Sequence, residues 1–460
     1  MTAPGAAGPR NPTTDPTPRA ERTPRAERTP SAERTPSAER TPSAGGTPGA
    51  ERTPAGPLRP AVQNPAFHHS APPESASRGS RPAGSVPAAE FSSPGPGGPR
   101  KPIKVVAFGG GHGLAVSLRA LRQADAGLPL DITAVVTVGD NGGSSGRLRV
   151  ERHAQLPPGD LRMALAALAD DDPTHQRTVA LMQHRFALVD KPERRGDPAT
   201  PRRRADDPPP SGRDDPLKPG RALAATGGGS ADPLAGHAVG NLLLLGLMEL
   251  LGDPVEALEH AGRMVGAQGR VLPMAGHAVG IEADVRGGDP DRPDEVVTVQ
   301  GQHAVAVATG QVEAVRITPS SPPASPPALA AIAEADWLIF GPGSWYTSVL
   351  PHLLVPELAA AIVASPARRL VTLNLAAENE TAGLSVADHL AALHWYLPQL
   401  HVDTVLADPT WVGEPDPVHR AAKALGAELV LASLAVADGS ARHDPESLGV
   451  ALVPVLGAAR

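Results

Sequence analysis

The stretch KVVAFGGGHG, residues 104–113, decides the fold class of this chain. Its first half is a near-continuous apolar run, as expected of a strand that is buried on both faces of a sheet. Its second half is a glycine-rich turn, and a helical apolar pattern follows from Leu114 to Leu121. A buried strand that leads through a glycine loop into a helix is typical of a parallel α/β sheet.

The same unit recurs along the chain. Strands are predicted at 104–108, 132–138, 337–340 and 370–375, and helices at 114–121, 161–168, 242–251 and 353–363. Strands that alternate with helices predict a doubly wound, mostly parallel sheet with helices on both faces. Residues 297–317 alternate in polarity and contain Gly310, which indicates a β-rich subregion on that scaffold.

Three loops follow predicted strands and are rich in glycine and hydroxyl side chains. They span 109–113, 139–147 and 341–348. Open α/β sheets bind ligands at the carboxyl ends of their strands, so the three loops are expected to meet around one ligand. The candidate ligand-binding residues in these loops are Gly110, Gly111, His112, Gly113, Asp140, Gly142, Gly143, Ser144, Ser145, Arg147, Gly343, Ser344 and Thr347.

The residue types in these loops suit a phosphorylated ligand. Glycines let backbone N–H groups approach an anion, and a following helix adds the positive end of its dipole. The hydroxyls of Ser144 and Ser145 are suited to a phosphate or sugar, and Arg147 to its charge. Asp140 is suited to a ribose hydroxyl or, through water, to a divalent cation. A plain surface turn remains the alternative for each loop taken alone.

Two further segments belong with the loops. Asp160 stands near the start of a predicted helix, where a carboxylate is a natural cap, and a ligand contact by Asp160 or Arg162 is the alternative. His237 and Asn241 are spaced i, i+4 and are expected to share a helix face. We include Asp160, His237 and Asn241 among the candidate ligand-binding residues.

Several familiar site patterns are excluded. A dinucleotide fingerprint that begins at Gly109 fails at Leu114, and no Gly-Lys-Ser/Thr P-loop is present. The run 142–146 matches G-x-S-x-G, but Ser144 lies too far beyond its strand to be a nucleophile elbow. No His/Asp/Glu group has the spacing of a transition-metal site, and we assign no metal ligand and no catalytic residue. Trp345 and Tyr346 either stack on a base or divide between core and surface.

The rest of the chain is poorly suited to folding. Of 460 residues, 54 are Pro and 48 are Gly. A six-residue repeat between Ala20 and Ala44 and a Pro/Gly/Ser bias predict that residues 1–100 are a disordered tail. A second such segment, 191–230, reads as a disordered surface insertion. The expected organisation is therefore a single α/β domain at 101–440, interrupted by that insertion, and a C-terminal extension at 441–460 in which 450–456 adds a short element.

Charge and composition limit location and partners. The net charge of −7 provides no basic field for nucleic acid, and the chain has no cysteine. No signal peptide and no apolar run long enough for a membrane span are seen, so we expect a cytoplasmic protein. A Ser/Thr kinase acting on the Thr-Pro steps of the tail and a homo-oligomer are partners that the sequence leaves open.

The motifs resemble a known family, the YvcK-like gluconeogenesis factors, within the superfamily of 2-phospho-L-lactate transferases (CofD-like). Five separated motifs agree and occur in family order. Asn141 departs from the family's second acid, and Glu378-Asn379 departs from the residues that precede its Glu-Thr-x-Gly stretch. The carrying residues are 109–114, 134–138 with 142–149, 158–162, 236–237 with 240–242, and 341–344 with 346–348.

The resemblance implies a Rossmann-like fold, UDP-N-acetylglucosamine as ligand, and a role in cell shape and cell-wall synthesis during growth on gluconeogenic carbon. It implies no established reaction, so a regulator is expected rather than an enzyme. The alternative is a 2-phospho-L-lactate transferase acting on a deazaflavin, with Asp140 and Asp160 as Mg²⁺ or base groups. A nicotinamide dehydrogenase is a third reading, disfavoured by Leu114.

Overall fold

The computed structural model describes residues 101–187, 232–289, 291–376, 379–381 and 384–458. The predicted tail at 1–100 and the predicted insertion at 191–230 lie outside the described residues. Within the described ranges, no helix is both long and apolar enough to cross a bilayer.

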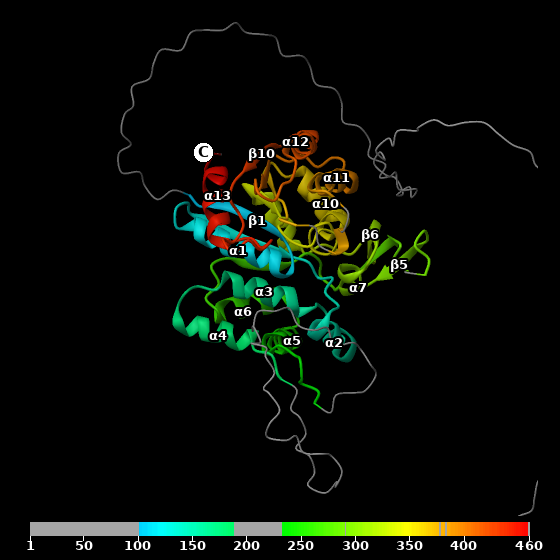
Figure 1. Cartoon of the computed structure of the whole chain (residues 1–460). Helices are drawn as coiled ribbons and strands as arrows, with labels where there is room; N and C mark the ends of the chain where they lie inside the picture. Colours follow the sequence, from blue (N-terminus) through cyan, green and yellow to red (C-terminus); the bar gives the residue numbers. More distant parts are fainter. Residues whose placement is uncertain (1–100, 188–231, 290, 377–378, 382–383, 459–460) are drawn as a thin grey trace, which may run out of the picture. The chain divides into compact units, whose positions relative to one another are not determined.

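A seven-stranded parallel sheet forms the centre of the fold (Figure 1). The strand order is β10-β9-β8-β7-β1-β2-β3, so the chain builds outward from β1 to β3 and then returns to place β7 on the other side of β1. This is the doubly wound order, in which the crossovers diverge between β1 and β7 and leave a crevice at their carboxyl ends. The strands are β1 (Ile103–Gly109), β2 (Leu130–Val136), β3 (Arg270–Pro273), β7 (Trp337–Phe340), β8 (Arg368–Thr372), β9 (Thr404–Ala407) and β10 (Glu428–Leu431).

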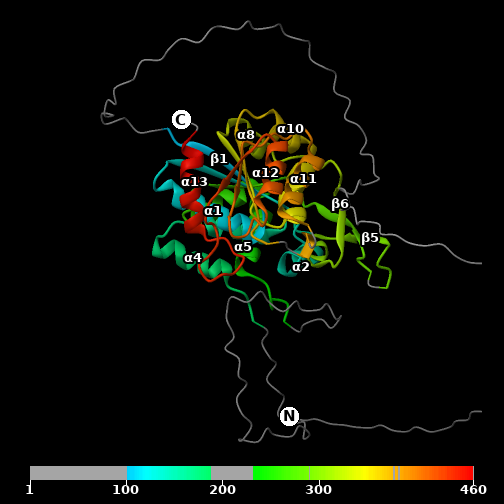
Figure 2. The ribbon, with the colours of Figure 1, turned by 45° about the horizontal axis from the view of Figure 1, so that its top comes forward.

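Helices cover both faces of the sheet. Figure 2 shows α13 beside α1, and α8 beside α10 away from that pair. The helices are α1 (Gly111–Asp125), α2 (Gly143–Arg152), α3 (Pro158–Leu168), α4 (Pro173–Gln183), α5 (Val239–Leu251), α6 (Pro254–Met264), α7 (Gln302–Val307), α8 (Pro326–Glu334), η1 (Trp345–Val349), α9 (Pro351–Leu354), α10 (Pro356–Ala364), η2 (Asn379–Thr381), α11 (Val386–Tyr396), α12 (Pro415–Ala424) and α13 (Pro445–Gly457).

A smaller antiparallel sheet, ordered β5-β4-β6, lies between β3 and β7 in the chain. Its strands are β4 (Gly280–Arg286), β5 (Val296–Gln300) and β6 (Gln311–Thr318). The β-rich subregion predicted at 297–317 corresponds to β5 and β6, with α7 between them. The sequence reading missed β4, which pairs with both.

The core is mainly aliphatic, and two aromatic rings join its central strands. Phe108 in β1 stacks on Phe340 in β7 with ring centroids 4.9 Å apart. Both rings are fully buried, as expected for strands that have helices on each side. This contact fixes β1 against β7 immediately before each strand opens into a glycine loop.

The predicted α/β class is confirmed, and most of the strands that were predicted differ from the structure in their boundaries. β2 ends at Val136 rather than 138, and β8 ends at Thr372 rather than 375. The helix predicted at 353–363 is wrong as one element, because Pro356 starts a new helix after the extended Val355. In the predicted C-terminal extension, α13 packs against α1.

Candidate functional site

The first and third glycine loops are in direct backbone contact. A methyl group added at Gly113 would collide with the Cα atom of Gly343 and with the carbonyl of Pro342. Gly343 has φ +139°, a conformation that favours glycine. The Asn374 side chain clamps this loop, because it accepts from the Gly343 N–H and donates to the Gly343 carbonyl, each at 2.9 Å. The sequence reasoning did not find Asn374.

The second loop closes against the start of α3. Asp140 Oδ1 accepts from the Gly142 N–H at 2.8 Å, which makes a tight turn before α2. Ser145 Oγ accepts from the Gly159 N–H at 3.0 Å. A methyl group at Gly159 would lie 2.5 Å from Asp140 Oδ2, so only glycine lets α3 approach this closely. Asp140 and Ser145 therefore border the same junction.

Asp160 points from the first turn of α3 toward the first loop. The predicted capping role is wrong, because Pro157 is the N-cap residue and no side chain caps this helix. Instead, a methyl group added at Gly110 would lie 2.6 Å from Asp160 Oδ2. A carboxyl group thus already lies at the amino end of α1, where the sequence predicted an anion.

The carboxyl group of Asp160 is buried, and its Oδ2 atom has no hydrogen-bond partner within the part of the chain that the structure describes. Burial, followed by the charge of Asp140, raises the pKa of Asp160 to about 8. The Gly111 N–H and the charge of Arg162 act in the opposite direction. Asp160 is therefore protonated over much of the neutral range unless a cation or a ligand lies beside it.

Helix α7, which lies between β5 and β6 in the chain, also reaches the site. Gln302, at the start of α7, donates to the Thr347 carbonyl at 3.1 Å and favours the ionised form of Asp160. Thr347 Oγ1 in turn donates to Ser344 Oγ at 2.8 Å. The predicted residues Ser344 and Thr347 are thus linked to Asp160 through Gln302, a residue that no sequence pattern singled out.

A chain of buried polar side chains connects α2, α5 and α3. Ser144 Oγ is hydrogen-bonded to His237 Nδ1 at 2.9 Å and accepts from Asn241 Nδ2 at 2.9 Å. Asn241 Oδ1 accepts from Arg162 Nε at 2.8 Å. The expectation that His237 and Asn241 share a helix face is wrong, because α5 begins at Val239. They meet nevertheless at Ser144.

Gly240 provides the room for this chain. A methyl group there would lie 2.8 Å from Arg162 Cδ and 2.8 Å from the Met182 carbonyl. Burial, then the charge of Arg147, lowers the pKa of His237, so this imidazole is neutral near pH 7. Gly240 therefore leaves room for the Arg162 side chain, and Asn241 orients its guanidinium through a hydrogen bond.

Arg147 and the two aromatic candidates lie differently from what the sequence suggested. The Arg147 guanidinium donates to the carbonyls of Ala235 at 2.6 Å and of Pro233 at 2.8 Å, so it anchors the segment before α5. Its role as a ligand group stays a prediction. Trp345 and Tyr346 are both buried, so the reading that exposes one of them is wrong. Trp345 packs edge-on against His389.

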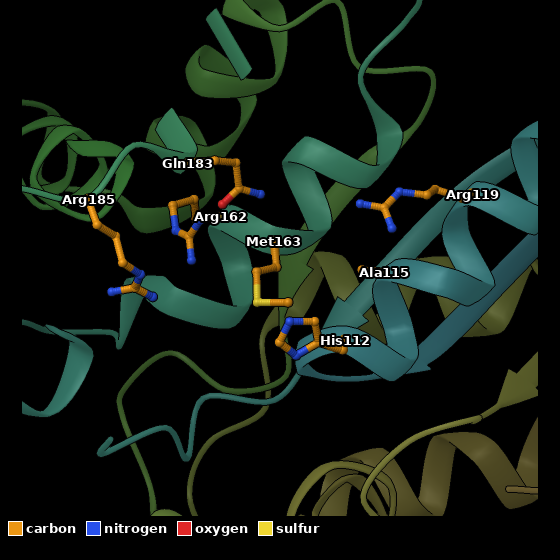
Figure 3. A pocket seen from close by; sticks show the side chains of 7 residues that line it. All are labelled: His112, Ala115, Arg119, Arg162, Met163, Gln183 and Arg185. Carbon is orange, nitrogen blue, oxygen red and sulfur yellow. The ribbon is translucent and has the colours of Figure 1, made fainter. Parts of the chain in front are cut away.

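A cavity of about 300 Å³ opens beside the first loop (Figure 3). We call it the arginine cavity. His112, Ala115 and Arg119 line it from one face of α1, at spacings i, i+3 and i+7. Burial, followed by the charges of Arg119 and Arg162, lowers the pKa of His112. The full lining is His112, Ala115, Arg119, Arg162, Met163, Gln183 and Arg185.

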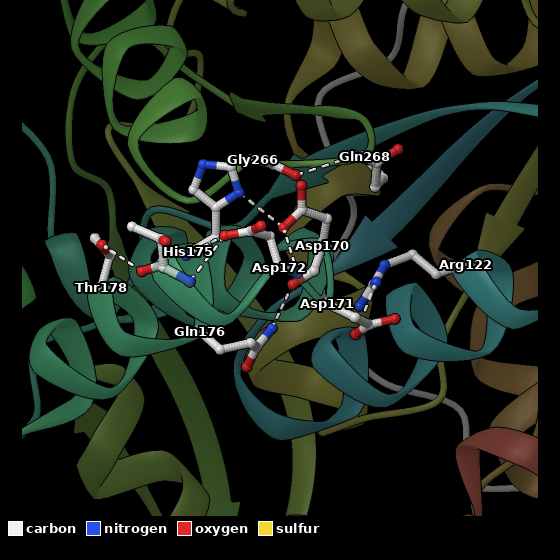
Figure 4. A network of polar contacts seen from close by, with 10 residues as sticks. Arg122, Asp170, Asp171, Asp172, His175, Gln176, Thr178, Gly266 and Gln268 are labelled. Carbon is white, nitrogen blue, oxygen red and sulfur yellow. Dashed lines mark hydrogen bonds and ion pairs between the residues drawn. The ribbon is translucent and has the colours of Figure 1, made fainter.

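A second cavity, of about 360 Å³, has a different character. We call it the mixed cavity; it is lined by Arg122, Asp125, Ala126, Ile132, Asp170, Asp171 and Gln268. Figure 4 shows Arg122 against Asp171 and His175 against Asp170. The distance is 3.3 Å between Arg122 Nη2 and Asp171 Oδ1 and 2.8 Å between His175 Nδ1 and Asp170 Oδ1. Arg122, the basic residue among the described residues that line this cavity, thus has a carboxylate partner, and His175, which lies outside the lining, pairs with Asp170.

The chain has clear relatives among known proteins. A family model described as "2-phospho-L-lactate transferase CofD" matches residues 105–430. A "Putative gluconeogenesis factor" of Mycobacterium tuberculosis is 44% identical, over 76% of this chain and 89% of that protein. The "Gluconeogenesis factor" of Bacillus subtilis is 32% identical, over 69% of this chain and 81% of its own length.

A solved structure agrees with these matches. The crystal structure of a member of the UPF0052 family from Bacillus halodurans is 30% identical, with a TM-score of 0.59, and covers 77% of this chain and 100% of that chain. The family match at 105–430 includes all three glycine loops and both cavities.

Proposed function

This chain belongs to the CofD family and, within it, to the gluconeogenesis factors, and from that premise we propose that it is a regulator that binds a nucleotide sugar of the UDP-N-acetylglucosamine type. The observation that carries the proposal is the meeting of the three loops at one end of the sheet. Gly113 and Gly343 touch there, and Asp160 lies against Gly110. Such a crevice supplies backbone N–H groups, hydroxyls and carboxyls to one extended polar ligand.

The polar groups of the junction suit binding better than catalysis. His237 is hydrogen-bonded to Ser144, as a base that activates a serine nucleophile would be. Both side chains are buried, however, and belong to the hydrogen-bonded chain that reaches Arg162. A nucleophile must be open to its substrate. We therefore assign the regulatory role, in cell shape and cell-wall synthesis during growth on gluconeogenic carbon, to ligand binding and not to turnover.

Calorimetric titration of the full chain with UDP-N-acetylglucosamine tests the proposal. We expect saturable heat and a rise in unfolding temperature with ligand concentration, because a ligand that binds only the native state stabilises it. UDP-glucose is the matched control for the acetamido group. Absence of both heat and stabilisation at millimolar ligand would sink the proposal.

The family model's own description favours one alternative, a transferase of the 2-phospho-L-lactate type that acts on a deazaflavin. Such chemistry calls for Mg²⁺, and the donor set fits: Asp140 borders Asp160, whose buried Oδ2 atom lacks a partner among the described residues. Mg²⁺ commonly takes one or two carboxylates together with substrate phosphates. There it would neutralise phosphate charge. Product formation from deazaflavin and activated phospholactate, lost in Asp140→Asn, would favour this alternative.

A further inference from the structure

The arginine cavity gathers three guanidinium groups, and the described residues that line it include no carboxylate. Within the described ranges, none of Arg119, Arg162 and Arg185 forms an ion pair with an acidic side chain. Three like charges around about 300 Å³ repel one another. The arrangement raises the free energy of the native state unless an anion enters.

Arg162 is the strongest indication of such an anion. Its side chain is only 4% exposed, and its one hydrogen bond in the described part of the chain goes from Nε to the neutral amide of Asn241. Burial, followed by the charge of Arg185, lowers the pKa of Arg162 to about 10, whereas the charges of Asp160 and Asp140 raise it, so Arg162 stays charged at neutral pH. A buried cation without an ion-pair partner is costly, and a ligand that supplies the opposite charge offsets that cost.

The remaining groups form an open rim above this buried charge. Arg119 on α1 and Arg185 after α4 are exposed, and Figure 3 shows their side chains on opposite sides of Arg162 and Met163. Arg185 donates to the Gly236 carbonyl at 3.1 Å, which limits its freedom. His112 and Gln183 add neutral donors.

We propose that the arginine cavity binds a phosphoryl or diphosphoryl group of a small molecule, with Arg162 at its floor and Arg119 and Arg185 at its rim. A terminal diphosphate carries about three negative charges at neutral pH and the doubly esterified diphosphate of a nucleotide sugar about two, whereas a single carboxylate carries one. Guanidinium groups suit phosphate oxygens because their donors form a planar fork. The cavity volume of about 300 Å³ accommodates such a group.

The motif residues Ser144, His237 and Asn241 then act as positioning residues for Arg162. Each is buried, and together they form one hydrogen-bonded chain that ends at Arg162 Nε. This reading explains why the three side chains converge away from open solvent. Ser144, His237 and Asn241 thus affect ligand binding indirectly, because they set the orientation of the Arg162 guanidinium.

The proposal stands on the charges of the cavity and not on the identity of the nucleotide sugar. Titration of the full chain with inorganic pyrophosphate therefore tests it directly. We expect Arg119→Gln and Arg185→Gln each to weaken pyrophosphate binding about tenfold, the scale of one charge-assisted hydrogen bond. Arg177→Gln is the matched control, because Arg177 is an exposed arginine of α4 outside the lining. It should change the affinity less than about twofold.

Asn241→Asp tests the role of Arg162 with little change of shape. The new carboxylate would lie next to Arg162 Nε and neutralise the floor of the cavity, so pyrophosphate binding should fall about tenfold while the unfolding temperature is kept or rises. A purely structural role of this pair leaves the affinity unchanged, and that result would overturn the assignment. If this variant does not fold, the comparison of Arg119, Arg185 and Arg177 still decides.

Three further ligands separate the sources of the phosphoryl group and separate this proposal from the proposed function. Tighter binding of UDP than of pyrophosphate, with none for uridine, identifies a nucleotide diphosphate; equal binding identifies free phosphates. Pyrophosphate binding without UDP-N-acetylglucosamine binding contradicts the proposed function alone. Wild-type protein that shows no heat with pyrophosphate, or equal losses in the Arg119 and Arg177 variants, overturns the cavity's assignment.

Discussion

Helix α1 contributes one arginine to each of two cavities, and the two arginines differ in whether they form an ion pair. Arg122 lines the mixed cavity and pairs with Asp171 at 3.3 Å, next to the Asp170–His175 pair. Arg119 lines the arginine cavity, where the part of the lining that the structure describes holds no carboxylate. Both cavities are of similar size, so volume does not distinguish them.

The contacts of the two cavities distinguish polar groups with a structural role from polar groups that are available to a ligand. At the mixed cavity the Arg122 guanidinium has a carboxylate partner in Asp171, and Asp172 caps α4 nearby through the Thr174 N–H at 2.8 Å. In the arginine cavity a buried hydrogen-bonded chain holds a cation in place without neutralising it. Partners that orient a charge but do not pair it are the mark of a binding site.

The largest expected effects come from glycines that keep each region open. Gly240→Ala would press on Arg162 Cδ and on the Met182 carbonyl, and Gly266→Ala, at φ +58°, would strain the backbone and collide with Asp170 and His175. Each should lower the free energy of unfolding by about 2–3 kcal/mol, measured by urea denaturation. Only Gly240→Ala should also weaken pyrophosphate binding. Equal binding losses in both variants would erase the distinction between the cavities.

Ser144→Ala should cost about 1–3 kcal/mol, because it leaves the buried side chains of His237 and Asn241 without their shared partner. Ser145→Ala is its matched neighbour, since Ser145 accepts a single hydrogen bond from the Gly159 N–H. We expect it to cost about 1 kcal/mol. Thermal denaturation with and without pyrophosphate measures both. A Ser144 variant that keeps wild-type pyrophosphate affinity would contradict its positioning role.

The pH dependence of stability tests the acidic side of the site. Native Asp160 keeps its proton up to about pH 8, whereas the unfolded chain loses it near pH 4. The stabilisation from Asp160 is therefore complete below pH 4 and is lost as the pH rises through about 8. Between pH 5 and 8 the wild type should lose about 1 kcal/mol or more relative to Asp160→Asn, in parallel urea titrations. Identical slopes for the two proteins would show that Asp160 ionises normally.

The smallest effects compare the two arginines of α1. Arg122→Gln breaks an ion pair whose carboxylate side chain is 92% exposed, so it should cost less than about 1 kcal/mol. Burial, followed by the charge of Arg122, lowers the pKa of Arg119, so Arg119→Gln removes a disfavoured cation and should not lower the unfolding temperature. Differential scanning calorimetry at low salt resolves the two. A clear loss of stability in Arg119→Gln would mean that this arginine has a structural partner.

The sequence was most informative where strand and loop chemistry coincide. Residues 104–108 and 337–340 were found because continuous apolar runs end in glycine, and the loops after them do meet. β3, β9 and β10 were missed, since four-residue strands without a loop signal are short for any periodicity. β4 was not predicted, because its pairing with β5 and β6 depends on tertiary structure that no local pattern encodes.

The candidate site was predicted by its motifs but not by its charges. Asp160, Ser144, His237 and Asn241 stood out, yet their burial and mutual contacts depend on how α2, α3 and α5 pack. Arg185 follows α4, and no local pattern relates it to Arg162. Arg119 had the one available signal, its place on the same face of α1 as His112.

The decisive experiment is a structure of the full chain bound to UDP-N-acetylglucosamine. We expect the ligand to lie in the crevice between β1 and β7, with diphosphate oxygens within hydrogen-bond distance of the Arg162 guanidinium and with Arg119 or Arg185 closing over them. A diphosphate bound elsewhere, with only solvent in the arginine cavity, would overturn the proposal that this cavity binds the diphosphate.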